Sequence, residues 1–103
     1  MPTQARRTPP EAHVAVLKVG PTHRVFPGDV KIQRGGIVHW HNLEFDRITV
    51  RVPDLGPVGF GSTRRGGSLA LRMNLTRHHY YTYTVEANGK KCQGSSSPGI
   101  IIK

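Results

Sequence analysis

Two pairs of histidines are the side chains of this sequence best suited to bind a transition-metal ion. His39 and His41 are two residues apart, so on a strand both would point to the same face. Two imidazoles at that spacing can chelate Cu²⁺, Ni²⁺ or Zn²⁺. His78 and His79 precede another strand-like segment, from which they could approach the first pair. The alternative is that all four are hydrophilic residues on a solvated sheet face.

Two pairs of basic residues are candidates for binding a partner. Arg64-Arg65 and Lys90-Lys91 lie in two predicted loops. If these loops meet at one end of the domain, their charges form a basic rim that would attract an acidic protein or another anionic partner. Tyr80 is expected to be exposed and could join this surface. The alternative is a general role in solubility, in keeping with a formal net charge of +9.

Nucleic acid is the less favoured anionic partner. Proteins that bind single strands stack the bases on exposed aromatic rings. Tyr81 and Tyr83 alternate with Thr82 and Thr84, which predicts that both tyrosines point into a core instead.

Membrane and targeting segments are not recognisable in the sequence. No apolar run reaches the roughly 18 residues that a membrane span needs, and residues 1–11 do not form an intact secretory signal. Two locations stay open: the periplasm or the extracellular space if a signal was removed, and the cytoplasm otherwise.

The remaining reactive side chains show no catalytic pattern. We find no Ser-His-Asp elbow, no HExxH motif and no phosphate-binding loop, so we expect no enzymatic activity. His13 and His23 stand alone and are expected to be structural or surface residues. Cys92 is the only cysteine and cannot form an intramolecular disulfide. Lys90 and Lys91 lie beside it and could lower the pKa of its thiol, although a loop thiol without a further role is the preferred interpretation.

Alternation of apolar and polar residues predicts an all-β protein. The 103 residues make one domain, in which Trp40 is the expected core anchor. Residues 1–11 are expected to be a disordered arm, and residues 53–67 a long glycine-rich loop. Strands are predicted at residues 13–19, 30–33, 37–42, 48–52, 69–73, 81–85 and 100–102. We therefore expect a Greek-key β-sandwich of seven to eight strands over residues 12–103.

The order of these features resembles that of the cupredoxins, the plastocyanin- and azurin-type domains. A Phe26-Pro27 turn leads into a strand, Gly36 marks the next turn, and the strand after it ends in Trp40-His41-Asn42. Near the end of the chain, Tyr81–Val85 and Gly99–Ile102 occupy the places of the family's last two strands. The resemblance covers about residues 13–103 and implies the same Greek-key sandwich.

The resemblance also implies that the family's copper site has been lost. A type 1 copper site needs two imidazoles, a thiolate and often a methionine. The thiolate position, two residues after Tyr83, holds Val85, and Asp46 and Arg47 stand where the first histidine would follow Asn42. No histidine or methionine occurs in the remainder of the chain after Val85. We therefore expect no resident cofactor, with copper as the alternative if the other histidines supply the ligands.

Two hypotheses on function follow. The first is a non-catalytic interaction module, without a blue-copper site, that engages a partner through its basic loops. The second is a copper-binding or electron-transfer protein with a non-standard, histidine-rich site.

Overall fold

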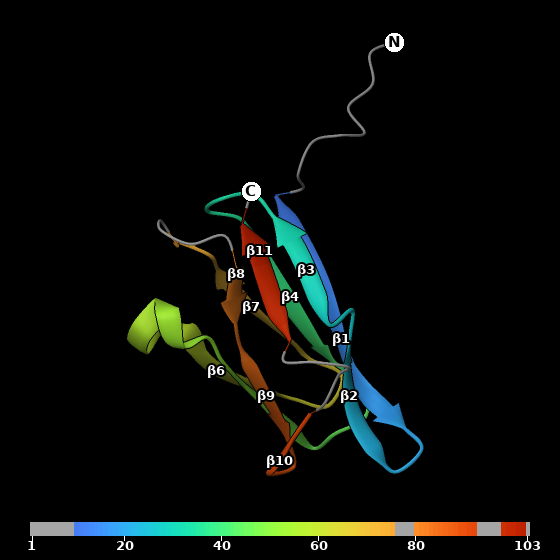
Figure 1. The fold of residues 1–103 in the computed structure, drawn as a ribbon. Helices are drawn as coiled ribbons and strands as arrows, with labels where there is room; N and C mark the ends of the chain where they lie inside the picture. The colour runs from blue at the N-terminus through green and yellow to red at the C-terminus, as the bar shows by residue number, and fades with distance from the viewer. Residues whose placement is uncertain (1–9, 76–79, 93–97, 103) are drawn as a thin grey trace.

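The computed structural model describes residues 10–75, 80–92 and 98–102, which fold into a β-sandwich (Figure 1). The predicted N-terminal arm falls almost wholly outside these residues, as do His78 and His79. The strands are β1 (Glu11–Val19), β2 (Thr22–Phe26), β3 (Asp29–Ile32), β4 (Ile37–Asn42), β5 (Arg47–Arg51), β6 (Phe60–Arg64), β7 (Ser68–Arg72), β8 (Tyr80–Thr82), β9 (Thr84–Ala87), β10 (Lys90–Lys91) and β11 (Gly99–Ile102). A short 3₁₀ segment, η1 (Pro53–Gly59), connects β5 to β6.

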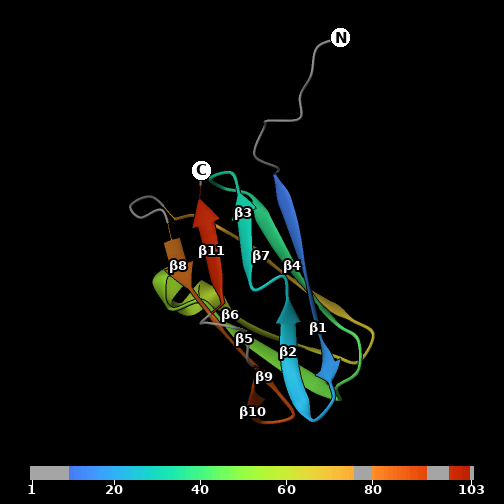
Figure 2. The ribbon, with the colours of Figure 1, turned by 45° about the vertical axis from the view of Figure 1, so that its right-hand side comes forward.

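The first layer of the sandwich has the strand order β2-β1-β4-β7. β1 pairs antiparallel with β2 and parallel with β4, and β4 pairs antiparallel with β7. Figure 2 shows β2, β1 and β4 next to one another in this layer. The parallel pair places two strands side by side that are separated by β2 and β3 in the sequence, which is how residues far apart in the chain meet on one face.

The second layer consists of two sheets that share one extended segment. β10-β9-β5-β6 form one sheet and β3-β11-β8 the other. β8 and β9 follow each other directly, interrupted only at Tyr83; β8 pairs with β11 and β9 pairs with β5 (Figure 2). The segment Tyr80–Ala87 therefore joins the two sheets into one layer.

The core lies between the layers and is built by strict alternation. On β1, Val14 and Val16 are fully buried, while His13 before them is exposed and Ala15 between them is half-buried. Trp40 of the first layer and Tyr83 of the second meet edge to face, with ring centroids 5.3 Å apart. Both rings are buried, as predicted for Trp40 and Tyr83. The period of two along each strand thus decides which side chains fill the core and which reach the solvent.

A buried amide holds the chain where β4 ends. Asn42 is fully buried, and its side-chain oxygen accepts the Phe45 N–H at 2.9 Å. Its side-chain nitrogen donates to the Phe45 carbonyl at 2.7 Å and to the Thr63 carbonyl at 3.3 Å. These bonds satisfy the polar atoms of Asn42 and close a tight turn that inserts the Phe45 ring into the core.

The expectation of a long loop over residues 53–67 was wrong. Residues 53–59 form η1, and β6 pairs antiparallel with β5 along its whole length. The segment was missed because Gly61, Ser62 and Thr63 carry no apolar alternation. Gly61 packs so closely that a Cβ there would lie 2.7 Å from Leu69 Cδ1. β6 is therefore a strand selected by close packing and pairing rather than by hydrophobic pattern.

Two further differences concern pairing. β2 and β10 were not expected, because β2 buries only Val25 fully and β10 has two residues. Both pair along an edge of a sheet, where backbone hydrogen bonds suffice to form a strand. Within the described residues, no helix is long and apolar enough to cross a bilayer.

Replacing Trp40 by Ala is expected to lower the free energy of unfolding by about 3–5 kcal/mol, because a buried aromatic ring is lost and a cavity remains. Tyr83→Phe is the contrasting variant. The Tyr83 hydroxyl is buried with no hydrogen-bond partner among the described residues, so its removal should cost less than about 1 kcal/mol. Urea unfolding followed by circular dichroism measures both. Equal stability of Trp40→Ala and the wild type would contradict the placement of the Trp40 side chain in the core.

Candidate metal centre

Three imidazoles from two strands stack on the outer face of the first layer. In the parallel register, His13 of β1 lies opposite His39 of β4, and Ala15 lies opposite His41. The ring of His13 stacks on both neighbours, with centroid distances of 4.7 Å to His39 and 5.1 Å to His41. Ala15 carries only a methyl group opposite His41, so the His13 ring can reach His41. The cluster therefore follows from pairing β1 with β4, and not from proximity in the sequence.

A carboxylate completes a group of metal-binding atoms. Glu11 is two residues before His13 on β1, so both side chains point outwards. Glu11 Oε1 lies 3.5 Å from His39 Nε2 and 4.0 Å from His13 Nε2. One donor atom from each of the three residues lies within 4.8 Å of the other two. Tetrahedral ligands of a zinc-sized ion are about 3.4 Å apart for bonds of about 2.0–2.1 Å, so modest side-chain rotation closes the set around an ion.

The surroundings of the His39 Nε2 atom favour a bound metal ion. This nitrogen is buried and has no hydrogen-bond partner among the residues that the structure describes. The nearest acidic oxygen in the described part of the chain, Glu11 Oε1, stands at 3.5 Å, which is an ion-pair distance and not a hydrogen bond. A buried polar atom without a partner is costly unless something satisfies it. A bound cation would do so.

His41 is not among the residues whose donor atoms converge, but it contacts one of them, His13. His13 Nδ1 and His41 Nε2 are 2.9 Å apart, and His41 Nδ1 is 2.7 Å from Ser68 Oγ. If His13 Nδ1–H donates to His41 Nε2, and His41 Nδ1–H donates to Ser68, then His13 Nε2 keeps its lone pair on the side of Glu11. Such hydrogen bonds on the far nitrogen fix the tautomer of a metal-binding histidine.

The environment of His41 supports this assignment of protons. Burial lowers the pKa of His41, and the charges of His13 and His39 lower it further. A lowered pKa keeps His41 neutral near pH 7, so its Nε2 can accept the proton of His13.

The structure brings together only part of the histidine set predicted from sequence. His39 and His41 share the outer face as expected, while His78 and His79 lie outside the described residues. His13 was expected to be isolated, and instead its ring contacts the rings of both His39 and His41. The signal for it was present, since Glu11-x-His13 has the same spacing of two as His39-x-His41, but nothing in the sequence says that the two strands pair.

The two basic pairs lie at the same end of the β10-β9-β5-β6 sheet. Arg64 is opposite Arg47 in β5, and Lys90 is opposite Ala87 at the end of β9. The two pairs thus flank the β5–β9 pair from opposite edges of the sheet. Arg65 is partly neutralised, because its Nη2 lies 2.8 Å from Asp46 Oδ1. A hollow of about 150 Å³ next to Lys90 and Lys91 is also lined by Pro21, Thr22 and His23.

Tyr80 is exposed as predicted but lies away from the basic pairs. It begins β8, at the opposite end of the segment from Ala87. Its hydroxyl donates to Asp29 Oδ1 at 3.2 Å. Tyr80 therefore lies on the β8 edge of the β3-β11-β8 sheet, with its side chain reaching across β11 to β3, and not at the basic end.

The positions of the expected copper ligands hold residues of another kind. Val85 is 1% exposed and forms part of the core, and Asp46 is exposed and paired with Arg65. Cys92 is buried, with its N–H donating to the Val85 carbonyl at 2.7 Å. Burial raises the pKa of Cys92 to about 11, so the alternative in which Lys90 and Lys91 lower the thiol pKa does not hold. Among the described residues there is no standard type 1 copper site.

Comparison with known proteins supports the fold alone. No family model and no curated protein matches this chain. Among solved structures, a reduced Cu(I) form of an amicyanin mutant has a TM-score of 0.63 and 14% identity, covering 96% of this chain and 88% of that chain. An oxidised amicyanin mutant has a TM-score of 0.60, also with 14% identity and the same coverage. The apo form of a copper-binding protein has a TM-score of 0.55 and 12% identity, covering 90% of this chain and 86% of that chain. The chain therefore has the cupredoxin-like all-β fold that its sequence resembles.

Native Cys92 is expected to react slowly with iodoacetamide near pH 8. Raising the thiol pKa from 9.0 to about 11 leaves about a hundredfold less thiolate at that pH, and burial also restricts access. Mass spectrometry of time points compares native protein with urea-unfolded protein, in which the thiol is free. Equal rates in the two states would show that Cys92 is accessible in the fold.

Proposed function

We propose that this protein binds a divalent transition-metal ion, with Cu²⁺ as the first candidate, through Glu11, His13 and His39 on the outer face of the sandwich. The observation that carries the proposal is the convergence of three donor atoms within 4.8 Å, one of them from His39, whose Nε2 has no hydrogen-bond partner in the described ranges. The role is one of binding, without a catalytic step.

The chemistry of the donor set favours copper or zinc. Two imidazoles and one carboxylate are ligands that suit Cu²⁺, Ni²⁺ and Zn²⁺, and Cu²⁺ binds most tightly in the usual order of divalent ions. Calcium and magnesium prefer sets made of oxygen atoms alone. The cupredoxin-like fold of known copper-binding proteins adds support to copper.

The exposure of the cluster favours an exchangeable ion. The side chains of Glu11 and His13 are 56% and 59% exposed, whereas that of His39 is 23% exposed. Water or an outside ligand can therefore complete the coordination of an ion held there. Because no thiolate takes part, the copper complex would lack the intense blue absorption of a type 1 site. An open site of this kind suits uptake and release of copper more than storage.

A second candidate function is docking of an acidic partner at the basic end. The observation that favours it is that Arg64 and Lys90 come from strands at opposite edges of one sheet but lie at the same end of it. Charges gathered in this way speed the association of an oppositely charged surface, and salt screens the effect. Both functions can coexist, since the metal cluster is on the other layer.

Tag-free protein stripped with EDTA is expected to bind one Cu²⁺, measured by calorimetry against a glycine competitor and by electron paramagnetic resonance. His39→Gln and His13→Gln each remove a ligand and should weaken binding at least tenfold, with the nitrogen hyperfine structure reduced to that of one imidazole. His41→Gln should weaken Cu²⁺ binding about tenfold, because the proton of His13 would no longer be held on Nδ1 by the hydrogen bond to His41. His23→Gln is the matched control, because His23 is a histidine outside the cluster, and it should bind as the wild type does. Unchanged affinity in His39→Gln would refute the site.

The basic end is tested with a soluble oligoglutamate peptide. Amide chemical-shift changes on titration are expected to gather around residues 64–65 and 88–91 at low salt and to fade as salt rises. The double variant Arg64→Gln, Lys90→Gln should weaken binding several-fold. The variant Lys31→Gln, Arg34→Gln has the same change in charge at exposed positions elsewhere and serves as the control. If both double variants weakened peptide binding equally, net charge alone would explain the binding, and the basic end would not be a specific docking site.

A further inference from the structure

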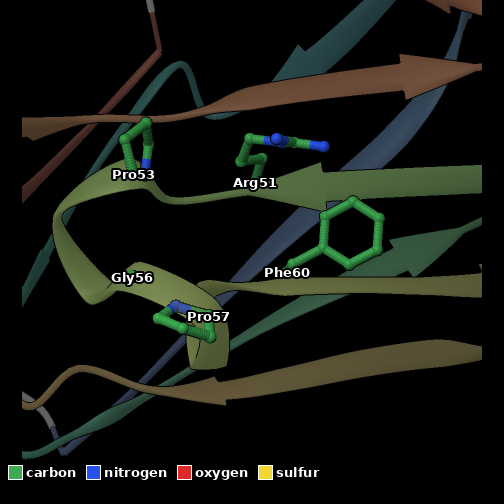
Figure 3. A pocket seen from close by; sticks show the side chains of 5 residues that line it. All are labelled: Arg51, Pro53, Gly56, Pro57 and Phe60. Atoms are coloured by element: carbon green, nitrogen blue, oxygen red, sulfur yellow. The ribbon is translucent and has the colours of Figure 1, made fainter.

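A hollow beside η1 lies on the second layer, away from the metal cluster. Figure 3 shows the hollow, which has a volume of about 530 Å³ and is lined by Arg51, Pro53, Gly56, Pro57 and Phe60. η1 connects the last residue of β5 to the first residue of β6. The hollow therefore lies at the end of this sheet opposite to Arg47 and Arg64.

One cation and one aromatic ring form the recognition elements of the hollow. Arg51 and Phe60 are opposite each other on β5 and β6, and the Arg51 guanidinium carbon lies 4.8 Å from the centroid of the Phe60 ring. At this distance the guanidinium makes a cation–π contact with the ring, which holds the cation beside it. Arg51 has no acidic side chain and no hydrogen-bond acceptor as a partner among the described residues. Its planar fork of donors is therefore available to an anion.

The remaining wall is apolar and has a fixed shape. Pro53 is the first residue of η1 and Pro57 lies within it, so two rings restrict the backbone there. Gly56 has φ 66° and ψ −143°, in a region of conformational space that favours glycine. A Cβ built at Gly56 would meet no atom within 4 Å, so the absent side chain leaves the hollow open. Phe60 is 51% exposed, which leaves its ring available to a ligand.

We propose that this hollow binds a small aryl carboxylate, with the carboxylate on the Arg51 guanidinium and the ring against Phe60 and Pro57. Its volume falls in the range of small-molecule sites, about 300–1,000 Å³, which are mostly apolar with a few placed polar groups. A guanidinium binds a carboxylate through two parallel hydrogen bonds, and the net charge of +9 draws anions to the protein. Asp54 is exposed nearby but is not among the lining residues, so it does not occupy the cation.

The proposal is independent of the metal site. The hollow is on β5, η1 and β6, whereas Glu11, His13 and His39 are on β1 and β4 of the other layer. Failure of one site therefore says nothing about the other.

The test is a titration of metal-free, full-length protein with 2-naphthoate, followed by amide chemical shifts. Saturable shifts are expected at residues 51–60. Arg51→Gln removes the carboxylate contact and should weaken binding about tenfold or more. Arg51→Lys keeps the charge but loses the fork, and should also weaken binding. Arg47→Gln is the matched control, because Arg47 is on the same strand and the same face as Arg51 but at the other end of β5. This variant should change the affinity for 2-naphthoate less than twofold.

Two further probes define the ligand chemistry. 2-Naphthamide has the same ring system without the charge and should bind at least tenfold more weakly, and acetate has the charge without the ring and should also bind weakly. A dipeptide ending in phenylalanine presents the same carboxylate and ring as part of a chain terminus. Binding of the dipeptide much more tightly than 2-naphthoate would overturn the assignment to a free small acid. So would unsaturable shifts, or equal binding by Arg51→Gln and the wild type.

Discussion

The parallel register between β1 and β4 is the constraint on which the candidate metal centre depends. It places Val14 opposite Trp40 on the inner face and His13 opposite His39 on the outer face. Because side chains alternate along a strand, the pairing that buries Val14 and Trp40 also exposes the two histidines as neighbours. A slip of one residue would turn the apolar set outwards at a cost of many kcal/mol in buried surface. The pairing that builds the hydrophobic core therefore also fixes the positions of the candidate ligands.

Close packing on the inner side keeps this register rigid. Trp40 contacts Tyr83 across the sandwich, and Asn42 ends β4 with three hydrogen bonds to the backbone. On the outer side, His41 contacts both His13 and Ser68, so the cluster extends over three adjacent strands. Ligand positions held by strands of a packed sheet vary less than positions on loops. The loops of this fold are not needed to build the site.

The sequence predicted correctly which face of a strand many side chains occupy, but it did not predict which strands lie next to each other. Alternation placed Trp40, Tyr81 and Tyr83 inside and His39 and His41 on one face, because a period of two is a local property. It could not show that β1 lies beside β4, since strand order depends on the whole chain. The contribution of His13 was missed for that reason. β6 was missed for a different one: its pairing with β5 depends on backbone hydrogen bonds and on the small size of Gly61, neither of which makes a hydrophobic pattern.

The environment of a side chain can also reverse an expectation based on its sequence neighbours. Lys90 and Lys91 precede Cys92, yet burial raises the pKa of the thiol, because charges on solvated side chains are screened while loss of water around a thiolate is not. The same principle explains why a metal site fits the outer face better than the place of the type 1 site. There, Val85 is packed in the core and offers no donor, so an ion would be desolvated without compensation. On the outer face, His39 is half-shielded and Glu11 is solvated, so an ion can keep part of its water shell while it satisfies the His39 nitrogen. The fold is thus cupredoxin-like, while among the described residues the candidate donor atoms lie on the opposite side of the first layer from the core.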